Sequence, residues 1–160
     1  MDSSNMTEAV VENIPGYLSA TLNCKCPRCR KGDLFQYKSA YNLKKGNYMK
    51  MNEKCLECGQ PTEIELGFYY GTGFVSYAIT VLFSIITFIL WWCIIGVSIN
   101  DNRLFWWLGL DIFFMLLLQP LFMRLARSFW ISWYVKYNKN WKGERPIEPE
   151  RTNNEMKNAW

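Results

Sequence analysis

The sequence predicts a membrane protein in which a small cytoplasmic β ribbon, held by four cysteines, precedes a hairpin of two transmembrane helices. Three features carry this prediction: two paired cysteine motifs, two long stretches almost free of charge, and an uneven distribution of lysine and arginine. They divide the 160-residue chain into an N-terminal lead-in (1–23), the cysteine ribbon (24–66), the hairpin with an interfacial C-terminal extension (67–137) and a polar tail (138–160).

The ribbon is predicted from Cys26, Cys29, Cys55 and Cys58, which form two C-x2-C motifs separated by 25 residues. Each motif can wrap a tight turn around one ion, and two motifs complete the tetrahedral four-thiolate site that suits Zn²⁺. Iron bound by four thiolates uses the same chemistry, so the sequence leaves iron open as well. Unliganded buried thiols and a redox dithiol are the alternatives, although a redox dithiol usually needs only one such motif on a βαβ frame.

Three short strands are expected around these motifs. Leu34–Tyr37 and Tyr48–Met51 lie on either side of a turn that contains lysine and glycine, and Glu63–Leu66 alternates polar and apolar residues as a half-buried strand does. Gly59 follows the second motif and is expected to take a positive φ, which glycine adopts without steric cost.

The other two cysteines are not expected to bind the metal. Cys24 would form an awkward chelate beside Cys26, so we interpret it as a spare thiol near the site. Cys93 lies in an apolar stretch and is predicted to be a small buried apolar residue. The first 22 residues carry no lysine, arginine or apolar segment typical of a secretory leader, so we expect the cysteines in a reducing compartment.

Two helices of membrane-spanning length are predicted in the second half of the chain. No charged residue occurs in Leu66–Asn100, and Asp111 is the only one in Leu104–Met123. A helix needs about 20 apolar residues to cross roughly 30 Å of hydrocarbon, so Phe74–Ile95 and Leu104–Ala126 are both long enough. A chain this small could not hide two such helices in a soluble core.

The ends of the helices indicate their orientation. Trp91 and Trp92 end the first helix and Trp106 and Trp107 begin the second, so both pairs are expected at one face of the membrane. Nine lysines and arginines precede the first helix, one lies in the loop between the helices and eight follow the second helix. The positive-inside rule therefore predicts that both termini are cytoplasmic and the loop external.

Polar residues of the second helix are candidate contacts with a partner. Asp111 is costly in lipid and is predicted to have a structural or partner-pairing role, with proton or ion handling as the alternative. Gln119 is a second candidate and precedes Pro120, which is expected to kink the helix. Arg124 is the third candidate. With Arg127 it is expected to extend to the inner headgroups, where a specific anionic lipid is an alternative ligand.

Composition argues against several classes of function. The chain has no histidine, which removes His-ligated haem and copper and the catalytic sets that use histidine as a base. No other nucleophile–base set or carboxylate pair is visible, so no catalytic residue is predicted and the chain is expected not to be an enzyme. The ribbon carries nine basic and five acidic residues. Tethering at a membrane favours lipid or protein contacts over nucleic acid.

Several stretches together resemble a bacterial family, the domain of unknown function numbered nine hundred eighty-three. They are Cys26–Phe35 (CPRCRKGDLF), Cys55–Gly59 (CLECG) and the Gly67–Gly71 entry into the hairpin (GFYYG), and the resemblance covers Leu22–Tyr134. It implies a zinc ribbon on a hairpin in the bacterial inner membrane and no established activity. Family members are often encoded near haem–copper oxidase genes, so the resemblance suggests an accessory or assembly role in respiration.

These inferences favour a non-enzymatic accessory or adaptor protein, either a subunit or an assembly component of a larger membrane complex such as a respiratory haem–copper oxidase. The ribbon would be a rigid docking head, and the hairpin would pack against the complex in the bilayer. A metal-handling or redox factor that uses the cysteine cluster is the first alternative. A membrane enzyme of unknown type is the second.

Overall fold

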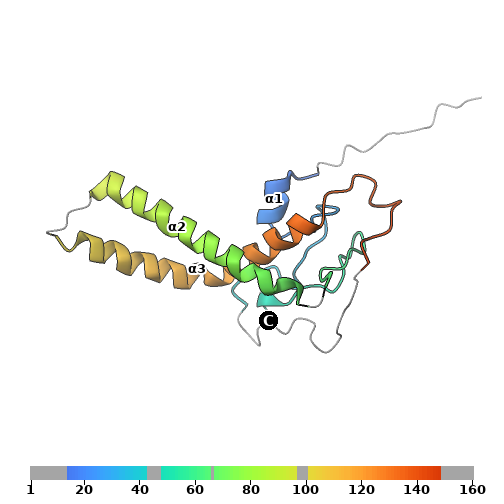
Figure 1. Ribbon diagram of the computed structural model, residues 1–160, viewed down its shortest axis with the longest axis horizontal. Coiled ribbons are helices and arrows are strands. Elements are labelled where there is room, and N and C mark those ends of the chain that lie inside the picture. Colours follow the sequence, from blue (N-terminus) through green and yellow to red (C-terminus); the bar gives the residue numbers. More distant parts are fainter. Residues whose placement is uncertain (1–13, 43–47, 66, 97–100, 149–160) are drawn as a thin grey trace, which may run out of the picture.

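The computed structural model describes residues 14–42, 48–65, 67–96 and 101–148. Its helical elements are α1 (Tyr17–Leu22), the short 3₁₀ helix η2 (Phe68–Gly71), α2 (Thr72–Ile95) and α3 (Arg103–Tyr134). Figure 1 shows α2 and α3 projecting side by side from one end of a compact head. We use "head" for α1, residues 23–65, η2 and residues 135–148, and "hairpin" for α2 and α3.

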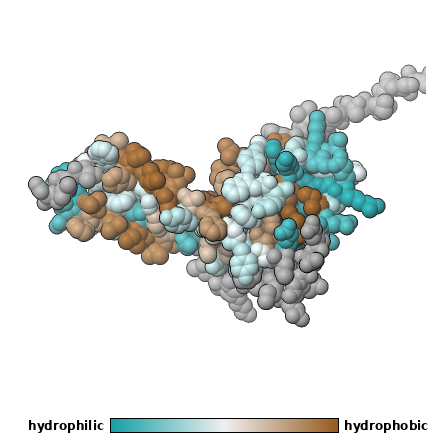
Figure 2. Space-filling model, in the orientation of Figure 1, coloured by the Kyte–Doolittle hydropathy of each residue, from teal (hydrophilic) through white to brown (hydrophobic). Residues whose placement is uncertain are grey.

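Both hairpin helices are long and apolar enough to cross a membrane. No residue in the most apolar 18-residue window of α2 is buried, so its apolar side chains point outward rather than into a protein core. Figure 2 shows this apolar surface along the hairpin, while hydrophilic residues gather on the head. The helices therefore differ from those of a soluble core, which bury at least one apolar face.

The hairpin is antiparallel, and its contacts fix which residues face one another. The rings of Phe88 and Trp107 lie 5.1 Å apart between centroids, and those of Phe83 and Phe122 lie 5.5 Å apart. Because α2 ends where α3 begins, the predicted tryptophan pairs lie at the same end of the hairpin. The helix predictions are close to the observed bounds, but α3 runs through Pro120 and extends without interruption to Tyr134.

The extra length of α3 places its last turns inside the head. At about 1.5 Å per residue, 32 residues of α3 extend roughly 12 Å farther than the 24 of α2. The C-terminal turns of α3 contact α1 and η2. The core of the head is shared between the cysteine module, η2 and the end of α3; its members are Cys26, Cys29, Leu34, Phe35, Met51, Cys55, Phe68, Tyr69, Ile131 and Val135.

The predicted β ribbon is not seen as strands in the described residues, although two of the predicted segments pair at one point. The described residues contain no strand, and the pairing is limited to isolated bridges, Lys25 with Asp33, Phe35 with Met51 and Lys54 with Pro61. Around the second bridge, hydrogen bonds link Gln36 N–H to the Lys50 carbonyl and Asn52 N–H to the Leu34 carbonyl, after which the chains separate. On one side of this bridge the ladder does not continue, because the carbonyls there accept hydrogen bonds from two arginines of α3 instead of from a neighbouring strand. Leu66, the end of the third expected strand, lies outside the described residues.

The polar composition of residues 138–160, with Pro146 and Pro149, predicts a mobile tail, but its described part contacts the head. Residues 138–148 pack on the head, beginning where Asn138 N–H donates to the Arg28 carbonyl at 3.1 Å. Trp141 packs against the core of the head. Farther along, Ile147 N–H donates to Gln60 Oε1 at 3.2 Å. The prediction for residues 149–160 lies outside the described residues.

Candidate metal centre

Four sulfur atoms meet at the centre of the head. Cys26 Sγ lies 3.7 Å from Cys58 Sγ, and Cys29 Sγ lies 3.7 Å from Cys55 Sγ. All four sulfurs lie within 4.8 Å of one another. A tetrahedron with Zn–S bonds of about 2.3 Å has edges of about 3.8 Å, so the observed spacing fits a four-thiolate ion. The four predicted cysteines thus form one cluster that can hold a metal ion.

The two cysteine turns have matching backbone conformations. Arg30 N–H donates to the Cys26 carbonyl at 2.7 Å, and Gly59 N–H donates to the Cys55 carbonyl at 2.9 Å. The residue after each second cysteine has a positive φ, 58° at Arg30 and 68° at Gly59. The prediction for Gly59 is confirmed. In the first turn the residue with positive φ is Arg30 and not glycine. A contact outside the turn stabilises this conformation, since the Arg30 guanidinium lies 4.2 Å from the Tyr137 ring centroid.

Hydrogen bonds among the four thiols shift their pKa values in opposite directions. The contact with Cys26 holds the pKa of Cys29 well below that of an ordinary thiol and lowers the pKa of Cys55 to about 7. The same cluster raises the pKa of Cys26, chiefly through its hydrogen bond with Cys29. Backbone N–H groups reinforce the thiolate form, since the Gly32 N–H lowers the pKa of Cys29. The pKa of Cys58 is raised as well, so Cys26 and Cys58 keep their protons until a cation displaces them.

Gly32 is required by the close approach of the two turns. Its carbonyl accepts a hydrogen bond from Cys26 N–H at 2.8 Å. A methyl group at this position would overlap Cys55 Sγ. Gly32 thus allows the second cysteine motif to come close to the first. Its position, six residues after Cys26, is the only feature of the sequence that indicates this close approach.

Three of the four sulfur ligands are buried, and only Cys58 is partly exposed. Cys24 does not belong to the cluster, as predicted, and burial raises its pKa. Cys93 is exposed on α2, so its prediction as a buried residue is wrong. A two-helix hairpin has one narrow contact seam, and Cys93 lies outside that seam.

Arg28, in the first C-x2-C motif, ties the tail to the metal centre. Its guanidinium donates to the carbonyls of Glu144 and Arg145, at 2.7 and 2.9 Å, and to the Cys58 carbonyl at 3.4 Å. The Gln60 side chain also exchanges hydrogen bonds with the backbone of Ile147, at 3.2 and 3.5 Å. The tail is therefore a strap across the second cysteine turn, which the polar composition of this segment did not indicate.

Arg124 occupies the junction between the hairpin and the head. Only 4% of the residue is exposed, and its guanidinium lies 4.6 Å from the Phe35 ring centroid. Three hydrogen bonds reach carbonyl groups between the two cysteine motifs, those of Tyr37 (2.7 Å), Lys38 (3.0 Å) and Tyr48 (2.6 Å). The expectation that Arg124 extends to the headgroups is wrong because the ribbon already surrounds its guanidinium with acceptors.

Arg127 repeats this arrangement one turn later. It is 3% exposed, donates to the Met49 carbonyl at 3.0 Å and lies 5.1 Å from the Tyr69 ring centroid. It does not extend to a headgroup either. Together with Arg124, it makes the end of α3 a fixed support for the loop between the two cysteine motifs.

Asp111 is buried at the hairpin interface. Its carboxylate accepts hydrogen bonds from the hydroxyls of Ser84 and Thr87, both at 2.8 Å. The polar partners expected from another protein are thus supplied by α2. Gln119, by contrast, is exposed on α3, and its side chain makes no hydrogen bond within the part of the chain that the structure describes.

Comparisons with protein-family models, with curated proteins and with solved structures find no match to this chain. The head and hairpin are therefore interpreted from their own geometry.

Proposed function

We propose that the protein is a membrane-anchored zinc accessory or adaptor protein, in which a rigid cytoplasmic head presents a docking surface to a larger membrane complex. One observation carries the proposal: α3 runs unbroken from the apolar hairpin into the metal module. The buried Arg124 guanidinium joins the two at that point through three carbonyl groups. A head fixed in this way would hold its surface at a set height and angle above the bilayer.

The membrane part of the proposal rests on the outward apolar faces of the two helices. Nine lysines and arginines precede α2, one (Arg103) begins α3 and eight follow Met123, and this distribution supports cytoplasmic termini. To test the orientation, a single cysteine is introduced at Asn102 in a Cys93→Ser chain. It should react with a membrane-impermeant thiol reagent in intact cells. Protection of that cysteine until the cells are opened would reverse the orientation.

The nature of the metal centre supports a structural role for zinc. All four ligands come from protein, which leaves no open coordination position for a substrate. Three of the sulfurs are buried and the strap crosses the second turn, so transfer of the ion to a client would require the head to open. These features favour the adaptor over the metal-handling and redox alternatives. Iron would be recognised by the colour of the purified protein.

A contact with a partner in the membrane is supported by Gln119. An exposed amide on a lipid-facing helix is unfavourable unless a neighbouring helix supplies a hydrogen-bond partner. The first candidate complex is a respiratory haem–copper oxidase. It is suggested by the resemblance to the family of unknown function and not by any contact in this chain. The proposed role is that of a subunit or assembly component in the bacterial inner membrane.

The test is gentle purification from native membranes, followed by identification of copurifying proteins. Oxidase subunits or assembly factors should be recovered, and deletion of the protein should lower oxidase abundance. Gln119→Leu should reduce recovery without changing zinc content, whereas Phe113→Leu, also exposed on α3, should not. A monodisperse protein without a membrane partner, from cells whose oxidase is unaffected by the deletion, would contradict the adaptor role.

A further inference from the structure

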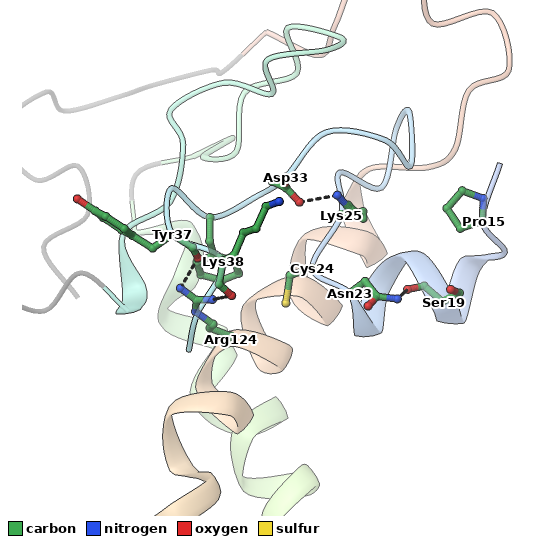
Figure 3. Close-up of a pocket in the computed structure, with 10 residues that line it drawn as sticks. Pro15, Ser19, Asn23, Cys24, Lys25, Asp33, Tyr37, Lys38 and Arg124 are labelled. Atoms are coloured by element: carbon green, nitrogen blue, oxygen red, sulfur yellow. Dashed lines mark hydrogen bonds and ion pairs between the residues drawn. The ribbon is translucent and has the colours of Figure 1, made fainter. Parts of the chain in front are cut away.

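A pocket of about 360 Å³ lies at the junction between head and hairpin, outside the metal centre. Figure 3 shows residues of α1, of the first cysteine segment and of α3 around it, with Arg124 on the side from which the hairpin helices continue. We call it the junction pocket. Its volume lies within the range of small-molecule sites, at roughly 300–1,000 Å³.

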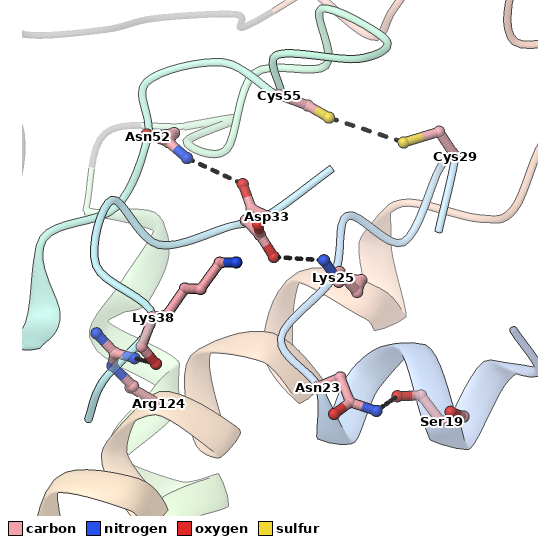
Figure 4. A network of polar contacts seen from close by, with 9 residues as sticks. All are labelled: Ser19, Asn23, Lys25, Cys29, Asp33, Lys38, Asn52, Cys55 and Arg124. Carbon is pink, nitrogen blue, oxygen red and sulfur yellow. Dashed lines mark hydrogen bonds and ion pairs between the residues drawn. The ribbon is translucent and has the colours of Figure 1, made fainter. Parts of the chain in front are cut away.

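The charge of the junction pocket favours an anion. Lys25, Lys38 and Arg124 line it, and Asp33 is its only carboxylate, which gives these side chains a net charge of +2. Lys25 Nζ and Asp33 Oδ1 form an ion pair of 2.6 Å, shown in Figure 4, and both side chains remain partly exposed. Lys38 is exposed, and its side chain extends into the pocket toward Asp33 in Figure 3.

Neutral groups add hydrogen-bonding capacity on the opposite wall. Ser19 of α1 and Asn23, which follows α1, line the pocket, and the Asn23 amide donates to the Ser19 carbonyl at 2.8 Å. The guanidinium of Arg124 uses three of its five N–H groups on the carbonyls of the ribbon and contributes a fixed positive charge at the base. Lysine ammonium groups around a small polar cavity are a common way to hold a phosphate.

The depth of the pocket identifies the source of the phosphate. The apolar stretch from Leu104 to Met123 ends directly before Arg124, and its 20 residues span about 30 Å, the thickness of the hydrocarbon core. A pocket at Arg124 therefore lies at the level of the phospholipid headgroups when the hairpin crosses a membrane. Tyr37, which lines the pocket, exposes part of its aromatic ring there.

We infer that the junction pocket binds the phosphate of an anionic phospholipid headgroup. This inference rests on the membrane insertion in the proposed function but not on any protein partner. Bound lipid would screen the charges of Lys25 and Lys38 and hold the junction at a fixed depth in the bilayer. Basic pockets on the cytoplasmic side of membrane helices recognise headgroups in this way.

The experiment uses the full chain, purified in detergent and titrated with phosphatidylglycerol or with phosphatidylcholine of the same acyl chains. Bound lipid is counted by native mass spectrometry. Lys25→Gln with Lys38→Gln should weaken phosphatidylglycerol binding about thirty-fold, the effect expected for two charges near an anionic surface. Lys54→Gln with Lys139→Gln removes the same charge from exposed positions outside the pocket and should leave binding unchanged.

Zinc content is measured for every variant, so that unfolding of the head can be distinguished from a loss of lipid binding. Lys38→Gln alone provides the same test without disturbing the ion pair of Lys25. Equal weakening in the pocket and control variants, or equal binding of the two lipids, would overturn the inference. Inorganic phosphate that binds as tightly as the lipid would assign the pocket to free phosphate and overturn the lipid source. Because no partner protein is present, failure here is distinguishable from failure of the adaptor role.

Discussion

The head and the hairpin differ in where their apolar and polar groups lie. In the head, sulfur, leucine and aromatic side chains form an interior. Three arginines are buried against backbone carbonyls there, Arg28 of the head itself and Arg124 and Arg127 from the end of α3. In the hairpin, the apolar side chains point outward, and the main polar contact between the helices is Asp111 with Ser84 and Thr87. Contacts within the protein therefore stabilise the head, whereas the outward apolar faces of the hairpin need an apolar environment.

This difference predicts unequal responses to substitution. The head has little apolar core for its length, so we predict that its fold depends on a metal held by the four cysteines and on a few buried hydrogen bonds. The hairpin keeps its helices wherever an apolar environment satisfies their surfaces, and single side chains contribute little. The following substitutions test that contrast, from the largest expected effect to the smallest.

Cys26→Ser should unfold the head, because removing one thiolate from a structural zinc site forfeits much of a binding free energy of about 10–16 kcal/mol. Cys24→Ser, two residues away and outside the cluster, should leave zinc content unchanged. Limited proteolysis checks the effect: cleavage should spread through residues 24–65 in the first variant only. Resistance of Cys26→Ser to the protease would show that the head folds without its metal.

Arg124→Leu should loosen the attachment of the head to α3. A fully buried carbonyl left without a donor costs about 1–3 kcal/mol, and Arg124 donates to three partly buried ones, each of which costs less than that when water replaces the donor. Arg103→Leu is the control, since Arg103 is half exposed and lies at the other end of α3. Thermal unfolding in detergent should show a lower midpoint for Arg124→Leu only. Equal midpoints for the two variants would remove Arg124 as the connection between the regions.

Gly32→Ala should weaken the metal site without abolishing it. The added methyl group would displace Cys55 Sγ, and disturbance of groups next to ligands typically costs 10–100-fold in metal affinity. Gly16→Ala, where a methyl group meets no atom within 4 Å, is the control. Competition with a chromophoric zinc chelator measures both affinities. An unchanged affinity for Gly32→Ala would contradict the close approach of the two cysteine turns.

Thr87→Val should have the smallest effect. The substitution removes one hydroxyl that donates to Asp111, and such bonds between membrane helices are worth about 0.6 kcal/mol on average. The Thr80 hydroxyl contacts only its own helix, at the Tyr77 carbonyl, so Thr80→Val is the matched control. Unfolding in mixed micelles should separate the two variants slightly. A loss several times larger for Thr87→Val would mean that the hairpin depends on this polar cluster as the head depends on its metal.

The same contrast explains which parts of the structure were predictable. Local sequence patterns predict the four clustered cysteines from their spacing and the two long helices from their composition. Both were identified from the sequence. The three strands were not predicted correctly, because C-x2-C turns can order a short segment without a continuous β ladder. Cys93 was misplaced because apolar surroundings in the sequence do not distinguish a lipid-facing side chain from a buried one.

The remaining differences come from contacts between distant segments. Arg124 lies 76 residues beyond Tyr48, whose carbonyl it binds, and Arg28 lies 116 residues before Glu144. A basic residue just after an apolar stretch fits both a headgroup contact and a buried bond to the ribbon, and the sequence pattern is the same for each. Only the folded arrangement of head and hairpin decides between them.

We propose above all that the head is folded around one zinc ion and carried on a membrane hairpin. Elemental analysis of the unsubstituted protein, extracted with detergent from a washed membrane fraction, tests this most directly. About one zinc per chain is expected, with the protein absent from the soluble fraction. Protein that is recovered without metal, or that is found in the soluble fraction, would contradict the claim.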